Sequence, residues 1–355
     1  MVGEDLDGLR HHGDVDAEQG LLDFAVNVRG DRPPPWLRER LAAAVDRLGR
    51  YPSAADDLAA RVAAAARHGR DPDEVLVLAG AAEGFALLPA LGPRLAVVIH
   101  PGFTEPEAAL REAGVTVRHV YTHEADGHRL RPDAVPDEAD LVVLGNPTNP
   151  TSVLHPAADV ARLARPGRVL VVDEAFADSA PGEPESLAGR ADLAGLLVLR
   201  SLTKTWALAG LRAGYALGAP ELLRRVAAPR PPWPVSTLAL EAVVACCQPE
   251  AVAQAEAAAA ETSAHREWQA AALAALPQVS VLRGGSAPYL LLRLPAGSGV
   301  TVRAALRAAG IAVRRADTFP GLTPDHLRVA VRPPATAQLL VDALGAALAS
   351  VAVTA

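Results

Sequence analysis

Lysine is almost missing from this sequence. Among its 34 basic residues one, Lys204, is a lysine, and all the others are arginines. A guanidinium stays protonated at physiological pH, whereas an ε-amine can lose its proton in a desolvated site, attack a carbonyl and form a Schiff base. On a solvated surface the two cations are nearly interchangeable. The function of the Lys204 amine therefore has to be inferred from the residues around it.

Cysteine and aromatic residues are scarce as well. The two cysteines, Cys246 and Cys247, are adjacent, so they offer neither a disulfide framework nor metal-ligand spacing, and they fit a reducing cytosol. Aromatic residues make up 4% of the chain, the net charge is −7, and arginines form only short doublets. We expect no nucleic-acid partner, because such a partner needs a basic stripe with interleaved aromatics.

Long apolar stretches are also lacking. By inspection no run reaches the length that crosses a membrane, and the N-terminal MVGEDLDGLRHHGD is too polar for a signal peptide. We therefore expect a soluble, cytoplasmic protein. Its 355 residues, 50% of them hydrophobic, are enough to bury one large core or two joined ones.

Short, continuous apolar runs separated by helical stretches are abundant. Seven such runs are expected to be strands: 75–79, 95–99, 115–120, 141–145, 169–172, 196–200 and 215–218. Continuous rather than alternating apolarity is typical of strands covered on both faces in a mostly parallel sheet. The stretches 82–91, 104–113 and 156–164 between them are helical candidates. This alternation predicts an α/β domain.

Two proline-rich breaks divide the chain. Residues 31–35, DRPPP, precede an amphipathic helix at 36–48, and PPWP at 231–234 precedes an alanine-rich helical region that extends to about 275. We expect residues 1–40 to form an N-terminal arm and part of a small domain, and 41–257 to form the large domain.

The C-terminal part, 258–355, is predicted to be a smaller α+β domain. Its expected elements are strands at 279–282, 289–293, 311–315 and 327–331 and helices at 301–309 and 335–349.

Several interpretations of the reactive residues can be set aside. Lys204 does not stand in the glycine-rich setting of a P-loop or in the V-A-I-K strand of a kinase. The stretch 201–204, SLTK, fits the S-x-x-K motif of penicillin-binding acyl enzymes, but their K-T-G strand needs a second lysine. His123 and His128 are five apart with a glycine between them, which disfavours a zinc-binding helix. We expect no metal.

Polar and small residues follow several predicted strands, where open α/β sheets bind their ligands. The turn AGAAEG at 79–84 would let backbone N–H groups approach an anion. The turn NPTNPT at 146–151 follows one strand, and Asp173 ends the next. A carboxylate at the end of a buried strand needs a cationic or hydrogen-bonding partner. Each feature alone is an ordinary turn or strand end.

The order of these features is specific. AGAAEG, NPTNPT, the D-E pair at Asp173, SLTK and GLRAGY follow one another as in pyridoxal-phosphate enzymes of fold type I, and the chain resembles their aspartate aminotransferase superfamily over nearly its whole length. The resemblance implies an α/β large domain with a mostly parallel seven-stranded sheet and a smaller α+β domain. It also implies pyridoxal 5′-phosphate as the cofactor and a homodimer with shared active sites.

The resemblance assigns roles to individual residues. Lys204 would form the Schiff base with the cofactor, and Asp173 would pair with its pyridine nitrogen. The other cofactor-binding residues that it implies are Ala81, Ala82, Phe103, Asn149, Phe176, Ser201, Thr203, Arg212 and Tyr51 of the partner subunit. Many relatives carry a tyrosine where Phe176 stands, so the cofactor's 3-oxygen would lose one donor.

Local stretches such as RYPS, HPGFTEP, LRSLTK and PPWPVSTLA are most similar to the histidinol-phosphate aminotransferase branch. Inside that branch the chain looks closest to L-threonine-O-3-phosphate decarboxylase of cobalamin biosynthesis, from which Asp14 is a departure. The candidate substrate-binding residues are His12, Asn27, Asn149, Arg314, Arg328 and Arg332.

Arginines dominate this set because planar guanidinium groups suit bidentate anion binding. Arg328 matches the superfamily's carboxylate-binding arginine, and Arg332, four positions later on a predicted strand, should project from the same face. Arg314 and His12 are candidates for a distal phosphate.

Three functions remain open at this point. The favoured one is a lyase like threonine-phosphate decarboxylase, making (R)-1-amino-2-propanol O-phosphate through an external aldimine and a quinonoid. The alternative is an aminotransferase acting on histidinol phosphate or another amino acid. A catalytically silent, cofactor-binding protein is the third.

Overall fold

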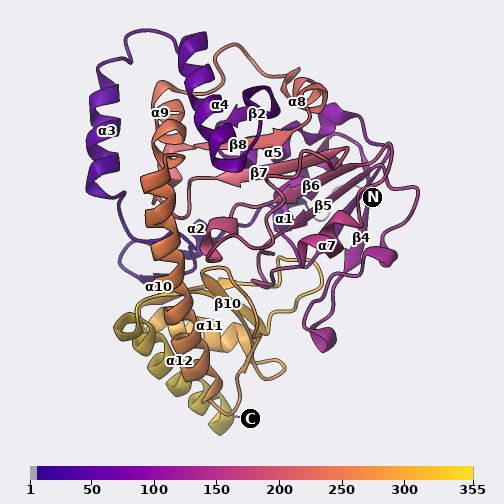
Figure 1. Cartoon of the computed structure of the whole chain (residues 1–355). Coiled ribbons are helices and arrows are strands. Elements are labelled where there is room, and N and C mark those ends of the chain that lie inside the picture. The colour runs from indigo at the N-terminus through magenta and orange to yellow at the C-terminus, as the bar shows by residue number, and fades with distance from the viewer. Residues whose placement is uncertain (1–5, 355) are drawn as a thin grey trace.

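A computed structural model describes residues 6–354 and contains two β-sheets joined by a long helix (Figure 1). The larger sheet has seven strands in the order β2-β8-β7-β6-β5-β3-β4, and the smaller has five in the order β1-β11-β12-β10-β9. Helix α10 runs from the larger part of the molecule down to the smaller part in Figure 1. The predicted α/β class is confirmed.

The strands of the larger sheet match the sequence pattern closely, and so do several of the helices around it. The strands are β2 (Val75–Leu78), β3 (Leu95–His100), β4 (Thr116–Tyr121), β5 (Leu141–Gly145), β6 (Val169–Asp173), β7 (Leu196–Ser201) and β8 (Gly214–Gly218). The helices around them are α3 (Pro35–Val45), α4 (Ala54–His68), α5 (Ala81–Leu87), α6 (Glu105–Glu112), α7 (Ala157–Ala161), α8 (Pro220–Ala227) and α9 (Thr237–Cys246).

Both faces of this sheet are buried, which explains why its strands are continuously apolar. Along β3, Val97 packs with the core that includes helices α3, α4, α7 and α9, while Val98 packs with the core of α5, α6 and α8. All pairings are parallel except those of β8, which runs antiparallel to both β2 and β7. The expectation of a mostly parallel sheet is confirmed.

The strand order reverses direction at β3, and such a reversal positions a ligand site. From β3 the chain first adds β4 on one side and then returns to place β5 on the other side of β3. Ligands of open α/β sheets bind at such a switch, outside the carboxyl ends of the strands. The segments after β3, β5, β6 and β7 carry Phe103, Asn149, Asp173 and Lys204.

The smaller sheet is built from both ends of the described chain. Its strands are β1 (Leu22–Phe24), β9 (Ser280–Val281), β10 (Tyr289–Arg293), β11 (Ile311–Arg315) and β12 (His326–Ala330). Strand β1 pairs parallel with β11, and the other pairings are antiparallel. The sequence pattern did not predict β1, because three residues are too few to show a period.

The remaining helices are α1 (Leu6–Leu9), α2 (Gly13–Asp16), α10 (Pro249–Ala274), α11 (Gly299–Ala308) and α12 (Pro334–Thr354). One face of the small sheet packs against α10, α11 and α12. The alanine-rich region expected as one helical stretch is two helices, α9 and α10, because Gln248 is extended and Pro249 starts a new helix. Helices α4 and α8 had not been predicted.

Helix α12 corrects one expectation from the sequence. It is long and apolar enough, by length and composition, to cross a membrane, although inspection had found no such stretch. Its residues Leu340 and Leu344 are fully buried in the core of the small sheet. A core helix of a globular fold passes the same test of length and composition, so α12 carries no conclusion about membranes.

Candidate active site

A cavity of about 450 Å³ lies at the carboxyl ends of the large-sheet strands and reaches the small sheet. It brings together almost all the residues that the sequence singled out: His12, Asn27, Ala81, Ala82, Phe103, Asn149, Asp173, Phe176, Ser201, Thr203, Lys204, Arg212, Arg314 and Arg328. These residues come from positions 12 to 328, so the cavity exists only in the folded chain.

Lys204 lies in a tight turn directly after β7. The turn is tied down on both sides: Leu202 N–H donates to the Ala213 carbonyl at 3.1 Å, and Arg29 N–H donates to the Lys204 carbonyl at 2.9 Å. Burial lowers the pKa of the Lys204 amine to about 8, and the positive charges of Arg328 and Arg212 act in the same direction. A usable fraction of this amine is therefore unprotonated near neutral pH.

Asp173 ends β6, and its carboxylate accepts a hydrogen bond from Ala175 N–H at 3.0 Å. Burial raises the pKa of the Asp173 carboxyl to about 6. A buried carboxylate with a single N–H donor is poised to accept a further, cationic donor such as a protonated ring nitrogen.

The acidic neighbour Glu174 is differently placed. Its carboxylate accepts hydrogen bonds from Leu187 N–H at 2.6 Å and from the Arg200 guanidinium at 3.0 Å. Glu174 is therefore committed to holding the sheet together, which leaves Asp173 as the carboxylate available to a ligand.

The turn from β2 into α5 forms a cradle for an anion. Gly80, with φ of 81°, approaches Arg212 so closely that a Cβ on it would lie 2.9 Å from the guanidinium. A Cβ on Gly214 would lie 3.1 Å from the Ala81 nitrogen. No side chain caps α5, so the N–H groups of its first turn, beside the Arg212 cation, are free to meet a phosphate.

Two more residues complete the wall expected for an aromatic ring ligand. Phe103 packs against Phe85, with ring centroids 5.7 Å apart, and against His12 at 5.6 Å. Asn149 accepts a hydrogen bond on its amide oxygen from Arg328 at 2.6 Å. The His12 imidazole hydrogen-bonds the Glu105 carboxylate at 2.6 Å.

Arg314 and Arg328 stand directly opposite each other on β11 and β12. Their neighbours Val313 and Val329 pack into the core, so the alternation of the strands turns both arginines toward the cavity. Both are buried, at 2% and 5% exposure, and burial lowers their pKa values, to about 10 for Arg314 and about 9 for Arg328.

Like charges directly opposite one another destabilise a sheet. Arg314 donates to the His11 carbonyl and Arg328 to the Ala25 carbonyl, both neutral acceptors. The nearest carboxylate to Arg314 is Asp16, at 3.6 Å. This cationic pair is built to receive an anionic ligand.

Phe176 packs edge-on against Tyr289, with ring centroids 5.0 Å apart, and the Lys204 amine lies 5.9 Å from the Phe176 ring centroid. The Tyr289 hydroxyl donates to the Thr148 carbonyl at 3.1 Å. Tyr289 therefore does not replace the hydroxyl that Phe176 lacks, because its own is already committed.

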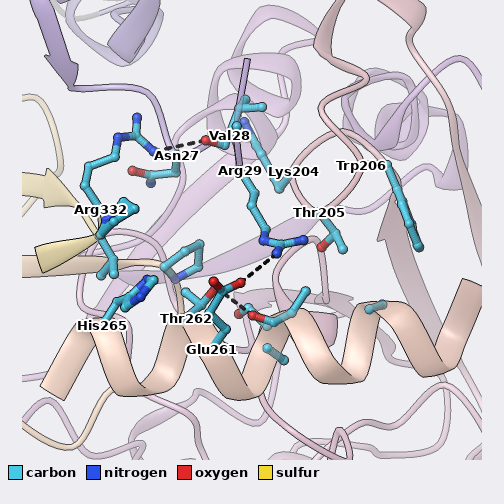
Figure 2. A pocket seen from close by; sticks show the side chains of 18 of the residues that line it. Asn27, Val28, Arg29, Lys204, Thr205, Trp206, Glu261, Thr262, His265 and Arg332 are labelled. Atoms are coloured by element: carbon cyan, nitrogen blue, oxygen red, sulfur yellow. Dashed lines mark hydrogen bonds and ion pairs between the residues drawn. The ribbon is translucent and has the colours of Figure 1, made fainter. Parts of the chain in front are cut away.

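Arg332 is not brought into this cavity, which corrects the expectation that it shares a face with Arg328. Strand β12 ends at Ala330, and beyond it the Arg332 side chain turns into a neighbouring cavity of about 660 Å³ (Figure 2). There its guanidinium donates to the carbonyls of Asp23, Val26 and Val28. With these donors used, Arg332 anchors the segment after β1 rather than offering itself to a substrate.

The second cavity shares Lys204, Phe176 and Asn27 with the first. Figure 2 shows Arg29 reaching across it to Glu261 on α10, with the two side chains joined at 3.0 Å. Tyr51 lines neither cavity of its own chain. It is 72% exposed and stacks on Trp233, with ring centroids 4.4 Å apart.

Within residues 6–354, one group of side chains has donors close enough for a metal: His100, Glu107 and His119. It lies outside the cavity. The Glu107 carboxylate accepts hydrogen bonds from His100 at 2.8 Å, His119 at 2.7 Å and Arg111 at 2.6 Å. A carboxylate filled by three donors, one of them a guanidinium, is a closed hydrogen-bond network rather than an open metal site.

Some lining residues were missed by the sequence reasoning, among them Asp14, Phe85, Thr104, Ala175 and Phe319. Ala175 and Thr104 adjoin predicted residues and could have been included on that ground. Phe319, in a loop after β11, had no signal of its own.

Fold and site together define a pyridoxal-phosphate-dependent enzyme of fold type I. The anion cradle at α5, the buried carboxylate of Asp173 and the buried amine of Lys204 line one cavity and fit the phosphate, ring nitrogen and aldehyde of pyridoxal 5′-phosphate. The family model for class I and II aminotransferases matches residues 20–344, and the chain belongs to this family.

Relatives at several distances agree with this assignment. The chain is 54% identical over 328 residues, 92% of its length and 88% of the relative's, to a histidinol-phosphate aminotransferase of Mycobacterium tuberculosis. It is 33% identical over 343 residues, 94% of this chain and 92% of the relative, to a threonine-phosphate decarboxylase of Salmonella typhimurium. A solved histidinol-phosphate aminotransferase from Clostridium acetobutylicum superposes with a TM-score of 0.85 at 22% identity, covering 93% of this chain and all of that one.

Proposed function

We propose that this protein is an aminotransferase that acts on L-histidinol phosphate, with 2-oxoglutarate as the amino-group acceptor. The observation that carries the proposal is the 54% identity over 92% of the chain to histidinol-phosphate aminotransferases. Threonine-phosphate decarboxylases are 33% to 36% identical. The aminotransferase alternative is thus better supported than the lyase that the sequence alone favoured.

Bound pyridoxal phosphate supplies an aldehyde for the amino group and an electron-withdrawing ring that stabilises negative charge at the substrate's α-carbon. Asp173, a buried carboxylate that accepts a single N–H hydrogen bond, would bind the pyridine nitrogen and keep it protonated. Asn149 would donate its amide N–H to the ring's 3-oxygen, and Phe103 would pack on the ring face. Ala81, Ala82, Ser201, Thr203 and Arg212 would hold the phosphate.

Lys204 would hold the cofactor covalently between turnovers and move the proton during them. Its amine has a pKa near 8, so it can both take a proton from the substrate's α-carbon and return one. The turn that carries it is fixed by hydrogen bonds to Ala213 and Arg29, which would hold the amine in place during the reaction.

Arg314 and Arg328 would bind the anionic group of the substrate. A dianionic phosphate between two facing guanidinium groups would relieve their mutual repulsion and accept several charge-assisted hydrogen bonds. The same pair would accept the α-carboxylate of glutamate in the other half of the reaction. Asn27 lines the same cavity as this pair and Lys204.

The deciding experiment is to incubate the holoprotein with L-histidinol phosphate and 2-oxoglutarate and to measure glutamate. We expect glutamate to form only when both substrates are present, and the Lys204→Ala variant to form none. Release of CO2 from O-phospho-L-threonine without any keto acid, together with no glutamate, would refute the proposal.

That outcome would instead support the second candidate, a threonine-phosphate decarboxylase. Its supporting observations are the 33% identical Salmonella relative and the presence of Arg314 and His12 in the same cavity as Arg328, where they could separate a phosphate from a carboxylate.

We further infer that the active protein is a homodimer with shared active sites. Residues 45–62 carry five exposed large apolar side chains, Val45, Leu48, Tyr51, Leu58 and Val62. Burying them against a second copy would remove this apolar surface from water. Tyr51, which lines no cavity of its own chain, would then reach the cofactor phosphate of the neighbouring subunit.

A further inference from the structure

One acidic side chain in the cavity has no part in the mechanism above. Asp14 lies in α2 (Gly13–Asp16) and lines the same cavity as Lys204, Arg314 and Arg328. It is exposed at the rim of a site whose other charged groups are mostly cations. The binding of cofactor and of an anionic substrate group does not account for a carboxylate at this position.

The backbone that carries Asp14 is held firmly on both sides. Arg314 donates to the His11 carbonyl at 2.6 Å, just before the turn, and His11 in turn bonds Asp16 at 3.1 Å. A Cβ on Gly13 would lie 2.6 Å from the Ala25 oxygen, so the turn is packed against the segment after β1. The position of the Asp14 backbone is therefore set by the fold, and its side chain starts from the cavity wall.

Asp14 also differs from its acidic neighbour in having no partner. Asp16 pairs with His11, Arg303 and Arg314. For Asp14 we find no hydrogen bond or ion pair to any residue between 6 and 354. Its charge nevertheless reaches the reacting amine, because it acts to raise the pKa of Lys204.

The chemistry of a lone carboxylate restricts what can lie against it. It accepts hydrogen bonds and donates none, and it repels a second anion. If Arg314 and Arg328 take the substrate's anionic group, the other substituent of the reacting carbon must face the remaining walls, of which α2 is one. An imidazole N–H suits Asp14, whereas a phosphate does not.

We propose that Asp14 is a specificity-determining residue that accepts a hydrogen bond from an N–H-bearing, uncharged or cationic substrate side chain and disfavours a phosphate placed against α2. The inference rests on the proposed function, in which that side chain is the imidazole of histidinol phosphate. It adds that the cavity discriminates against a substrate that would place a phosphate against α2, as O-phospho-L-threonine would with its carboxylate on Arg314 and Arg328.

The test compares affinities and needs no turnover. The absorbance of the holoprotein is titrated with L-histidinol phosphate and with O-phospho-L-threonine, for the wild type, Asp14→Asn and Glu18→Gln. Glu18 is an exposed acid of the same segment that pairs with Arg307 and does not line the cavity, so its variant removes one charge without changing the site.

We expect Asp14→Asn to lower the ratio of affinity for histidinol phosphate over phosphothreonine by about tenfold or more, as the loss of one charge-assisted hydrogen bond implies. Glu18→Gln should leave the ratio within about twofold, the range of surface substitutions. An unchanged ratio in Asp14→Asn, or an equal loss of affinity for both ligands, would overturn the proposal.

The affinity test of Asp14 can be distinguished from the activity test of the proposed function. If the wild type forms no glutamate from histidinol phosphate, the aminotransferase proposal fails, yet the affinity ratio still decides the role of Asp14. In a protein that does turn over, the loss in Asp14→Asn should appear in KM for histidinol phosphate, with kcat and the KM for glutamate little changed.

Discussion

At the scale of single residues, the solitary lysine makes the central assignment unusually easy to test. Because the chain has one ε-amine, borohydride reduction of the holoprotein can fix the cofactor only to Lys204 or to the terminal amine. We expect peptide mass mapping to find the reduced cofactor on Lys204 alone.

Two variants of Lys204 distinguish the need for a reactive amine from the need for a positive charge. Lys204→Ala and Lys204→Arg should both show no borohydride-stable label, although the arginine keeps the positive charge. A label that persists in either variant would show that another group holds the cofactor.

The lowered pKa of Lys204 gives a pH dependence with a defined sign. An amine attacks an aldehyde only when it is unprotonated, so covalent attachment of pyridoxal phosphate to the cofactor-free protein should speed up as pH rises through about 8. At pH 7 roughly a tenth of the amine is unprotonated with that pKa.

A stopped-flow series of the attachment rate between pH 6 and pH 10 provides the measurement. Nα-acetyl-lysine serves as the control, because the rate for its free ε-amine should keep rising toward about pH 10.4. If the protein followed the free amine instead, burial and the nearby arginines would not be lowering the Lys204 pKa.

At the scale of elements, the cradle for the phosphate depends on β8 and the start of α5 lying unusually close together. A Cβ on Gly214 would meet the Arg200 carbonyl at 2.6 Å and the Ala81 nitrogen at 3.1 Å. Both neighbours are backbone atoms of the sheet and the helix, which cannot move aside at low cost.

Gly214→Ala should therefore destabilise the protein by about 1–3 kcal/mol and also weaken cofactor binding, because it pushes the α5 N–H groups out of place. Urea unfolding and a cofactor titration measure the two effects. Gly49→Ala is the matched control, since nothing lies within 4 Å of its added Cβ. Equal behaviour of the two variants would contradict the close packing of β8 and α5.

At the scale of the whole molecule, the proposed homodimer with shared active sites predicts complementation between two defective chains. Tyr51→Ala should lack the side chain given to the partner, and Lys204→Ala should lack the amine of its own site. A mixed dimer would contain one intact site, made of Lys204 from one chain and Tyr51 of the partner subunit.

Each variant alone should show little activity, whereas an equal mixture after dissociation and reassociation should recover about a quarter of wild-type activity by random pairing. Sedimentation confirms that the dimer forms in each case. A mixture no more active than its parts, although dimeric, would show that the sites are not shared.

Much of the fold and of the candidate active site could be predicted from the order of residues in the sequence. The continuous apolarity of strands such as 95–99 and 141–145 predicted burial on both faces, and all seven strands of the large sheet are found where the pattern placed them. The strand-end positions of Asn149, Asp173 and Lys204 predicted that they meet, because parallel strands bring their carboxyl ends to one edge.

The amino-acid sequence by itself determined which groups could do the chemistry: one nucleophilic amine, one carboxylate at a buried strand end, and a turn of small residues before a helix. Only the tertiary structure decided which arginines line the cavity. The antiparallel register of β11 and β12 places Arg314 opposite Arg328. Strand β12 ends two residues before Arg332, whose guanidinium donates to backbone carbonyls instead. Register and strand ends depend on contacts between distant segments, which no local pattern contains.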